Sequence, residues 1–550
     1  RIGLSALSNL LEDVLENRAT EYTLDLLERT AKTTYLSSDC AIGYEAGEMV
    51  LTALSGFRDD FEQHVRKHSC GYDVQGEVPC VRGCPAHVDI PAYISLVEEG
   101  RYTDAIKVIR KDNPLPLVCG LVCEHPCEMH CRRAMVDNPL NILALKRYAA
   151  EHMEETYTPQ CFPATGKKVA VIGGGPAGLS CAYYLATMGH SVKIFEARKH
   201  LGGMLRYGIP NYRLPRERLQ SEIDWLLSAG IEVELEHSVS GEELQELRKT
   251  YDSVFVGIGA HTDKKLGLEG EDLNGVESAV QLLRAVGDYD IPDLSGQDIV
   301  VIGGGNVAMD AVRTAVRLKS EKVTCLYRRR VADMTALPAE IEGALAEGVE
   351  MMTLKAPSKL EVKNGKLTGV WVTPQMISKI KDGRASVVST GEPDIFIPCE
   401  VLVVAIGQDI ETQHYEESGI PIDRGKLFTM PSASFKGIPG LFSGGDCASG
   451  PATVIKAIAA GKVMAANIDE YLGYSHTISC DIEIPIPNID DRLACGRVEL
   501  GEREASERIK DFEGVEFCMS KKEACQESNR CLKCDHFGFG IFKGGRERLW

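Results

Sequence analysis

Residues 168–205, KVAVIGGGPAGLSCAYYLATMGHSVKIFEARKHLGGML, contain the pattern that decides the fold of this chain. A strand-like run at 169–172 leads into Gly-x-Gly-x-x-Gly, and a helix-length segment and a second strand at 191–195 follow. The first glycine permits a tight turn, the second lets the backbone approach a pyrophosphate, and the third lets the helix pack close to the strand. The helix N-terminus then points its free N–H groups at the phosphates.

Glu196 ends the second strand, where a carboxylate can bind the hydroxyls of an adenosine ribose. A glycine-rich turn in another kind of α/β domain is the alternative, but it does not explain the strand, helix, strand and acid together. The sequence therefore predicts a dinucleotide-binding domain. Its predicted contacts are Gly173, Gly175, Pro176, Ala177, Gly178 and Glu196.

A second fingerprint, VVIGGGNVA at 300–308, predicts a second dinucleotide domain inserted in the first. Its own second strand, at 322–327, ends in a run of arginines at 328–330 and has no carboxylate there. Guanidinium groups pair with a 2′-phosphate, so this pattern favours NADP(H) over NAD(H). A solvated charged turn is the alternative. The predicted contacts are Gly303, Gly305, Asn306, Ala308, Arg328 and Arg329.

Length and charge restrict the remaining possibilities. A chain of 550 residues is long enough for three or four domains. The net charge of −19 argues against nucleic acid or an anionic membrane surface as a partner. No apolar run approaches the roughly 20 residues that span a bilayer. No signal peptide opens the chain, so we expect a cytoplasmic protein; it begins without Met, and we expect that residues upstream have been lost.

The 19 cysteines are distributed unevenly, with seven between Cys70 and Cys131 and four between Cys518 and Cys534. At 119–131 a cysteine recurs at every fourth residue, and Pro85 follows a cysteine directly, as in cluster-binding runs. Thiolates gathered in this way repel one another unless a metal neutralises them, and they prefer iron–sulfur clusters or zinc. The alternatives are structural zinc or free thiols.

Residues 67–160, together with the nucleotide domains after them, resemble the small subunit of glutamate synthase. They also resemble the matching subunit of ferredoxin–NADP transhydrogenases and the flavin and cluster half of dihydropyrimidine dehydrogenase. The resemblance is carried by PCVRGCP, DIPAYISLVEEGRYTDAIKVIRKDNPLPLVCGLVC, CEMHC and NILALKRY. It implies two [4Fe-4S] clusters in this region.

The resemblance assigns one cluster to Cys84, Cys123 and Cys127, with a Gln or Glu from the following helix. It assigns the other to Cys80 and Cys131, with a Cys-x-x-Cys just upstream. The chain departs from this pattern twice. Lys146 stands at the Gln/Glu position, and Cys70 alone precedes Cys80. Cys119, which the family does not use, and His68 are alternative ligands.

The first dinucleotide domain also resembles the FAD domain of disulfide-reductase-like flavoproteins. In that family an Asp after the last strand holds the ribityl chain, and the next helix points its N-terminus at the pyrimidine edge of the flavin. The resemblance implies FAD here. It adds as contacts Gly203, Leu205, Arg213, Gly259, Gly445, Asp446 and Thr453.

The two ends of the chain carry further cysteines. Residues 1–66 are helical by pattern, with a third helix expected from about 48 to 65. From Ser37 to Val65 they resemble the C-terminal bundle of the complex I NADH-oxidising flavin subunit, which implies that Cys40 is the fourth ligand of a [4Fe-4S] cluster. The chain starts as though cut directly after the other three ligands. At the other end lie Cys518, Cys525, Cys531 and Cys534. The sequence allows three interpretations of these cysteines: a further [4Fe-4S] cluster, a zinc site or free thiols.

The predicted fold is α/β, with two nested Rossmann-like, disulfide-reductase-like nucleotide domains preceded by α-helical iron–sulfur domains. We expect a truncated helical bundle at 1–66 and a helical iron–sulfur domain at 67–160. The FAD domain is expected at 161–295 and 396–475, around an NADP(H) domain at 296–395. A cysteine-containing tail, 476–550, completes the chain.

The resemblance implies an oxidoreductase subunit that moves electrons between NADPH, FAD and [4Fe-4S] clusters. That chemistry requires no acid, base or nucleophile, so no catalytic side chain is predicted. The N-terminal bundle favours an electron-bifurcating transhydrogenase complex that couples NADPH with NADH and ferredoxin. The expected partners in this hetero-oligomer are an NADH-oxidising flavin subunit, ferredoxin-like subunits and ferredoxin. The alternatives are a glutamate synthase small subunit and a non-catalytic docking subunit.

Overall fold

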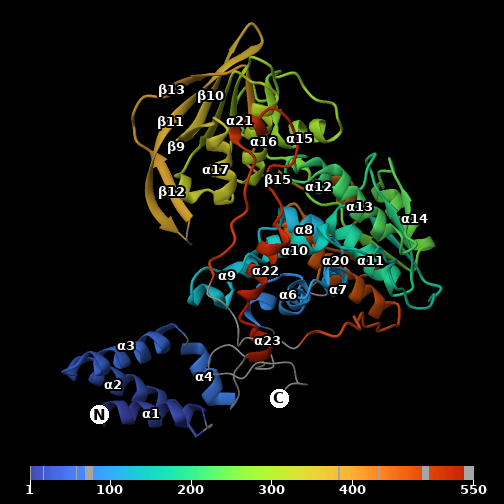
Figure 1. Cartoon of the computed structure of the whole chain (residues 1–550). Helices are drawn as coiled ribbons and strands as arrows, with labels where there is room; N and C mark the ends of the chain where they lie inside the picture. Colours follow the sequence, from blue (N-terminus) through green and yellow to red (C-terminus); the bar gives the residue numbers. More distant parts are fainter. Residues whose placement is uncertain are drawn as a thin grey trace. The chain divides into compact units, whose positions relative to one another are not determined.

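The computed structural model describes residues 2–15, 18–56, 58–67, 78–381, 384–430, 434–435, 437–485 and 495–537 (Figure 1). The chain divides into two compact units. One comprises residues 1–78 and 533–550, and the other comprises Pro79–Leu532. Among the described residues, no helix combines the length and the apolar composition needed to cross a bilayer.

The first unit contains a helical bundle with a small apolar core. Leu7, Leu27 and Leu54 are buried in it, and a Cβ on Gly47 would lie 2.8 Å from the carbonyl oxygen of Ala31, so two helices approach closely there. The third helix starts at residue 41, directly after Cys40, and not at about 48 as expected. The unit's helices are α1 (Ile2–Leu15), α2 (Glu21–Ser37), α3 (Ala41–Gly56), α4 (Arg58–Lys67) and α23 (Cys534–Phe537).

The second unit begins with a helical domain that carries most of the clustered cysteines. Its central helix, α6, is buried along almost its whole length, and Asp89 caps its N-terminus by accepting a hydrogen bond from Ala92 N–H at 3.2 Å. Gly120 lets two helices pack closely, because a Cβ there would lie 2.8 Å from Arg147 Cα. The elements are α5 (Pro79–Arg82), α6 (Ile90–Glu98), α7 (Tyr102–Arg110), α8 (Pro116–Val122), α9 (Pro126–Met129), η1 (Arg132–Met135) and α10 (Ile142–Glu151).

The first dinucleotide domain is built on a six-stranded sheet in the order β18-β19-β4-β1-β2-β3, parallel except for the β18–β19 pair. The strands are β1 (Lys168–Ile172), β2 (Ser191–Phe195), β3 (Glu232–Glu234), β4 (Ser253–Val256), β18 (Ser434–Phe435) and β19 (Ile438–Ser443). Its helices are α11 (Pro176–Thr187), α12 (Met204–Tyr207), α13 (Arg216–Leu227), α14 (Gly241–Thr250), α18 (Gln413–Glu417), α19 (Asp446–Ser449) and α20 (Val454–Tyr471). Helices α11 and α20 pack together, and each also contacts the sheet.

The second dinucleotide domain has a five-stranded parallel sheet in the order β6-β14-β7-β8-β9. The strands are β6 (Val276–Ser278), β7 (Asp298–Ile302), β8 (Lys322–Tyr327), β9 (Glu350–Thr353) and β14 (Val401–Val404). The helices α15 (Ala279–Gly287), α16 (Asn306–Arg317) and α17 (Pro338–Ala346) contribute to the core on one face of this sheet, and the turn η2 (Val331–Asp333) follows β8.

An antiparallel sheet shares a second apolar core with strands β7, β8 and β14 of this parallel sheet. Its strands are β10 (Lys355–Lys363), β11 (Lys366–Lys381), β12 (Arg384–Ser389) and β13 (Ile395–Pro398) (Figure 1). Short pairs join β5 (Thr262–Asp263) to β15 (Gln408–Asp409) and β16 (Ile422–Asp423) to β17 (Lys426–Leu427). The described part of the tail carries α21 (Ala505–Arg508) and α22 (Lys521–Asn529).

The nested arrangement confirms the predicted α/β fold, because β4 and β19 pair in the first sheet while the whole second sheet lies between them in sequence. The expected boundaries differ from the structure at two strands. β14 was expected to return the chain to the first domain, but it pairs with β7 and β6 in the second sheet. β6 was expected in the first domain and also belongs to the second. A short apolar run is compatible with either parallel sheet, so its composition does not identify the partner strands.

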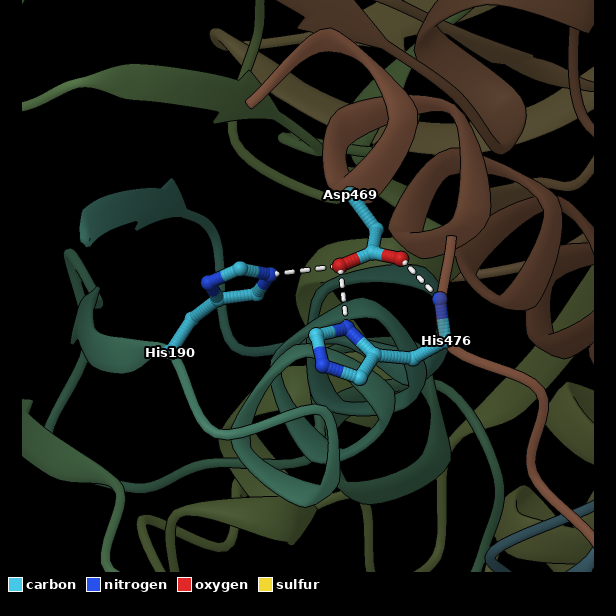
Figure 2. A group of neighbouring side chains, drawn as sticks. All are labelled: His190, Asp469 and His476. Atoms are coloured by element: carbon cyan, nitrogen blue, oxygen red, sulfur yellow. Dashed lines mark hydrogen bonds and ion pairs between the residues drawn. The ribbon is translucent and has the colours of Figure 1, made fainter. Parts of the chain in front are cut away.

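A buried polar group fixes the end of α20 to the start of the first sheet (Figure 2). Asp469 accepts a hydrogen bond from the backbone N–H of His476 at 2.7 Å, and its other oxygen lies 2.9 Å from His190 Nε2 and 2.8 Å from His476 Nδ1. Thr165 Oγ1 lies 2.8 Å from His190 Nδ1. Although such a donor set could hold a metal ion, the hydrogen bonds already satisfy the carboxylate, which makes the group a structural clamp.

Candidate functional site

A cavity of about 300 Å³ lies at the carboxyl ends of the strands of the first sheet. Open parallel sheets bind ligands at this edge. Twelve predicted contacts line the cavity: Gly173, Gly175, Pro176, Ala177, Glu196, Gly203, Leu205, Arg213, Gly259, Asn306, Asp446 and Thr453. The other seven predicted contacts lie outside the lining: Gly178, Gly303, Gly305, Ala308, Arg328, Arg329 and Gly445.

The three glycines of the first fingerprint have different physical roles. Gly173 adopts φ +102°, which side-chain-bearing residues rarely adopt. A Cβ on Gly178 would overlap the carbonyl oxygen of Gly173, so glycine is required there for packing. Gly175 has an ordinary φ of −80°, and its nearest neighbour to a Cβ would be Gly203 Cα at 3.8 Å. The chain itself therefore does not need glycine at 175, and the room left open fits a ligand phosphate.

Glu196 lines the cavity and is positioned by backbone donors. One of its oxygens accepts from Gly174 N–H at 2.7 Å and the other accepts from Arg198 N–H at 2.9 Å. Burial raises the pKa of Glu196 above its ordinary value, while these hydrogen bonds act in the opposite direction. Each carboxylate oxygen retains a further lone pair that can accept from a hydroxyl group.

Asp446 and Thr453 also line the cavity. Burial raises the pKa of Asp446 to about 6, and Ala452 N–H lowers it. Thr453 Oγ1 is buried and has no hydrogen-bond partner among the described residues. A buried hydroxyl without a partner is unfavourable unless a ligand supplies one. Together with the room beside Gly175, this orphaned atom shows that the cavity fits a dinucleotide such as FAD.

Residues from three domains form one wall of this cavity. Val122 and Glu124, which flank Cys123, both line it, as does Asn306 from the second fingerprint. Asn306 Nδ2 donates to Glu124 Oε1 at 2.9 Å, and Asn306 Oδ1 accepts from Leu337 N–H at 2.9 Å. The helical domain and the second dinucleotide domain are thus joined at the edge of the first-domain cavity.

Arg213 lies in the same lining, with its guanidinium group directed at acidic residues. Arg213 Nη1 lies 2.9 Å from both oxygens of Asp310, and Nε lies 2.8 Å from Glu340 Oε1. The side chain therefore fixes the second dinucleotide domain to the first. Its alkyl stem remains available to the cavity.

The three arginines after β8 differ in whether an acidic residue already pairs with them. Arg330 forms an ion pair with Asp333 at 2.8 Å, so its charge is already matched. Arg328 is exposed, and no ion pair is found for it among the described residues. Arg329 Nε is buried without a partner in the same part of the structure. The chain thus leaves Arg328 and Arg329, and not Arg330, available for an anion.

Cys84, Cys123 and Cys127 are buried close to Lys146, which is 8% exposed. Burial lowers the pKa of the Lys146 amine, but the surrounding thiols, first Cys123 and then Cys119, raise it, and the net pKa lies above its ordinary value. Burial raises the pKa of Cys123, and Lys146 lowers it. Three soft sulfur donors with one buried cation fit an anionic iron–sulfur cluster. A protonated amine provides no lone pair for iron, so Lys146 supplies a counter-charge and not a ligand while it is protonated.

The second pair of predicted ligands lies near the first group. Cys80 and Cys131 are half-buried, and Leu140 N–H points at Cys131 Sγ at 3.5 Å. A Cβ on Gly83 would lie 2.7 Å from the ring of His130, which brings the turns that carry the two cysteines together. Cys119 is fully buried. Cys70 and the alternative ligand His68 lie outside the described residues.

The structure gives the remaining predicted ligands different surroundings. Cys40 is exposed at the start of α3. Cys518 lies beside Glu151, the last residue of α10. Burial, and then the Glu151 carboxylate, raise the pKa of this thiol to about 12. Cys525 is exposed on α22, where Asn529 Nδ2 lies 3.5 Å from its Sγ. Cys531 follows α22 and is half-buried, while Cys534 opens α23 in the other unit.

Several residues of the cavity were not predicted from the sequence. Glu124 and Val122 could have been proposed, because they adjoin a predicted ligand. Arg198 follows Glu196 by two residues, and Arg284 donates to the carbonyl oxygen of His261 at 3.0 Å. All of them line the cavity. Arg284 lies on α15, and no sequence motif near it indicates that it would line the cavity.

Three family models match the chain, each over a different region. Residues 167–461 match pyridine nucleotide-disulphide oxidoreductase. Residues 62–158 match dihydropyrimidine dehydrogenase domain II, 4Fe-4S cluster. Residues 1–64 match the NADH-ubiquinone oxidoreductase-F iron-sulfur binding region. Binding domains for FAD, NAD(P) and 4Fe-4S clusters are therefore present, in agreement with the predicted cofactors.

Similar proteins extend over most of the chain. The NADP(+)-dependent formate dehydrogenase subunit beta of Moorella thermoacetica is 36% identical, over 85% of this chain and 72% of its own length. The NADPH-Fe(3+) oxidoreductase subunit beta of Geobacter sulfurreducens is 33% identical, over 97% and 87% respectively. The glutamate synthase [NADPH] small chain of Escherichia coli is 33% identical, over 72% and 89%. These relatives are subunits of larger enzymes.

Proposed function

This chain belongs to the pyridine nucleotide-disulphide oxidoreductase family as an NADP-dependent flavin and iron–sulfur oxidoreductase, and on that premise we propose that it works in an electron-bifurcating NADH and ferredoxin:NADP+ transhydrogenase complex. Its partners there would be an NADH-oxidising flavin subunit, ferredoxin-like subunits and ferredoxin. The match of residues 1–64 to the complex I iron–sulfur region supports this choice, because such a region serves NADH oxidation.

The observation that carries the proposal is the common wall formed by Val122, Glu124 and Asn306. A cluster held by Cys84, Cys123 and Cys127 would lie next to the cavity, because the residues on both sides of Cys123 line it. A nicotinamide bound at the second fingerprint would enter from the Asn306 side. Electron donor, flavin and first acceptor would thus lie at one junction.

The residues of the chain position these groups and exclude water. Gly175 leaves room for the pyrophosphate, Glu196 accepts from the ribose, and Asp446 with Thr453 would bind the ribityl chain and the ring edge. FAD, when bound, would take two electrons from NADPH and release them singly to the clusters. The hydrogen bond from Asn306 to Glu124 keeps the two flanking domains in register around this site.

The complex offers a direct test of the proposal. We expect the purified holo-complex to reduce NADP+ when NADH and reduced ferredoxin are supplied together, and NADPH to bleach the flavin absorbance of this subunit faster than NADH does. Activity confined to glutamine and 2-oxoglutarate would identify a glutamate synthase subunit instead. A flavin that NADPH does not bleach would identify a docking subunit.

Arg328 should determine the preference for NADPH. The Arg328→Ala variant is expected to raise KM for NADPH about 10- to 100-fold, because one charge-assisted hydrogen bond to the 2′-phosphate contributes about 1.5–3 kcal/mol. KM for NADH should stay unchanged. The matched control is Arg330→Ala, whose guanidinium is already paired with Asp333. Equal effects of the two substitutions, measured by steady-state kinetics, would contradict the assignment.

A further inference from the structure

The end of α22 is fixed to the loop that follows Cys131. Arg133 Nη1 donates to the carbonyl oxygen of Arg530 at 3.1 Å. Arg530 Nη2 in turn donates to Asp137 Oδ1 at 2.9 Å and to the carbonyl oxygen of Asn138 at 2.6 Å. Cys131 precedes Arg133 by two residues and Cys531 follows Arg530 directly, so the two thiols lie on contacting turns 400 residues apart in sequence.

Glu527 strengthens this attachment from inside the protein. Its side chain is fully buried, and its two oxygens accept from Asn141 N–H and Val498 N–H, each at 2.7 Å. Arg530 Nη1 lies 2.6 Å from the same carboxylate. A buried ion pair is costly to break, because loss of one partner leaves the other charge buried and unpaired. Here it holds the last turn of α22, and with it Cys531, in one place.

The segment that carries Cys80 also contacts the segment that carries Cys131. Its helix, α5, packs against α9, and Gly83 lies against the ring of His130, the residue before Cys131. Cys80 and Cys131 are both half-buried, as is Cys531. Between Cys40 and Cys80 the sequence contains Cys70 alone, so the Cys-x-x-Cys that the resemblance places just upstream of Cys80 does not occur there.

We propose that Cys531 is a ligand of a second iron–sulfur cluster of the helical domain, together with Cys80 and Cys131. This inference rests on the iron–sulfur chemistry of the proposed function. The segment of Cys131 contacts that of Cys531 through Arg133 and Arg530, and that of Cys80 through Gly83 and His130, so three cysteines far apart in sequence lie on contacting segments. Soft thiolates in such a group prefer an iron–sulfur cluster. The C-terminal segment thereby completes an N-terminal cluster and does not form a separate site with Cys518 and Cys525, whose neighbours are Glu151 and Asn529.

The first test is iron, sulfide and EPR analysis of the holoprotein purified without oxygen. Cys531→Ser should lose one cluster, seen as loss of one reduced-state EPR signal, and Cys131→Ser should lose the same signal. The double variant should lose no more than either single variant. Cys525→Ser, on the helix α22 that precedes Cys531, is the matched control and should keep all iron. Full iron in Cys531→Ser, or additive losses in the double variant, would overturn the proposal.

A second measurement needs no substitution and so does not depend on folding of a variant. In the native holoprotein, iodoacetamide should label the exposed Cys525 and spare Cys531, as read by peptide mass spectrometry. Removal of the clusters with an oxidant and an iron chelator should make Cys531 and Cys131 reactive together. Labelling of Cys531 that is the same before and after removal would refute its role. Bleaching of flavin by NADPH tests the proposed function separately, because it does not need this cluster.

Discussion

The Gly178→Ala variant is expected to lose both its bound FAD and much of its stability, whereas Gly175→Ala should lose only FAD. A Cβ at 178 would overlap the carbonyl oxygen of Gly173, where backbone must move to relieve the clash. Such overpacking destabilises a core by about 3 kcal/mol. At 175 the new methyl group would meet nothing in the protein closer than Gly203 Cα at 3.8 Å, so the fold should be unaffected.

The flavin affinity of Gly175→Ala should fall about 10- to 100-fold, because the methyl group takes the space of a phosphate at a cost of about 1–3 kcal/mol. Thermal unfolding of the apoproteins and titration with FAD, followed by flavin fluorescence, separate the two effects. Gly175→Ala is thus the matched control for Gly178→Ala. A Gly175→Ala protein that binds FAD normally would show that the pyrophosphate does not lie beside this glycine.

This contrast shows what the sequence can and cannot predict. The fingerprint around Gly173 and Gly178 could be predicted because its glycines serve a local turn: Gly173 has a positive φ, and a Cβ on Gly178 would overlap the carbonyl oxygen of Gly173. Of the twelve predicted contacts that line the cavity, six came from the two fingerprints and the acid after β2, and the other six came from the family resemblance. The partner strands of β14 were not readable, because they are chosen by packing across about a hundred residues and a run of valines suits either sheet.

The cysteines show the same limit at longer range. Spacing indicated only that the cysteines at 119–131 gather near one another, and the family resemblance was needed to assign Cys84, Cys123 and Cys127 to one cluster; all three are buried. Spacing also suggested that Cys518, Cys525, Cys531 and Cys534 form a group of their own, but Cys518 lies beside Glu151 and Cys525 is exposed. The contact between Arg133 and Arg530 depends on the tertiary fold, and no local pattern could have indicated it.

Cys123→Ser is expected to separate reduction of the flavin from the departure of electrons. NADPH should still bleach the flavin, because the serine side chain is nearly isosteric and the cavity residues Val122 and Glu124 are unchanged. The cluster beside the cavity should be lost. Reduction of ferredoxin by the complex should then fall by more than about 100-fold, since even changes to outer partners of a metal site cost about 10- to 100-fold.

Cys119→Ser is the matched control for this prediction. Cys119 lies one helical turn before Cys123 and is fully buried, and the family resemblance gives it no ligand role. Its substitution should leave iron content, EPR spectrum and ferredoxin reduction unchanged, and stopped-flow absorbance at the flavin band should be the same in both variants. If instead Cys119→Ser lost the cluster, Cys119 would be the fourth ligand. The residue at position 146 would then not need to bind iron, and a lysine could occupy the position of the family's Gln or Glu. Retention of the cluster in Cys123→Ser would show that Cys123 is not a ligand, and it would contradict the proposed electron path from the flavin to a cluster beside the cavity.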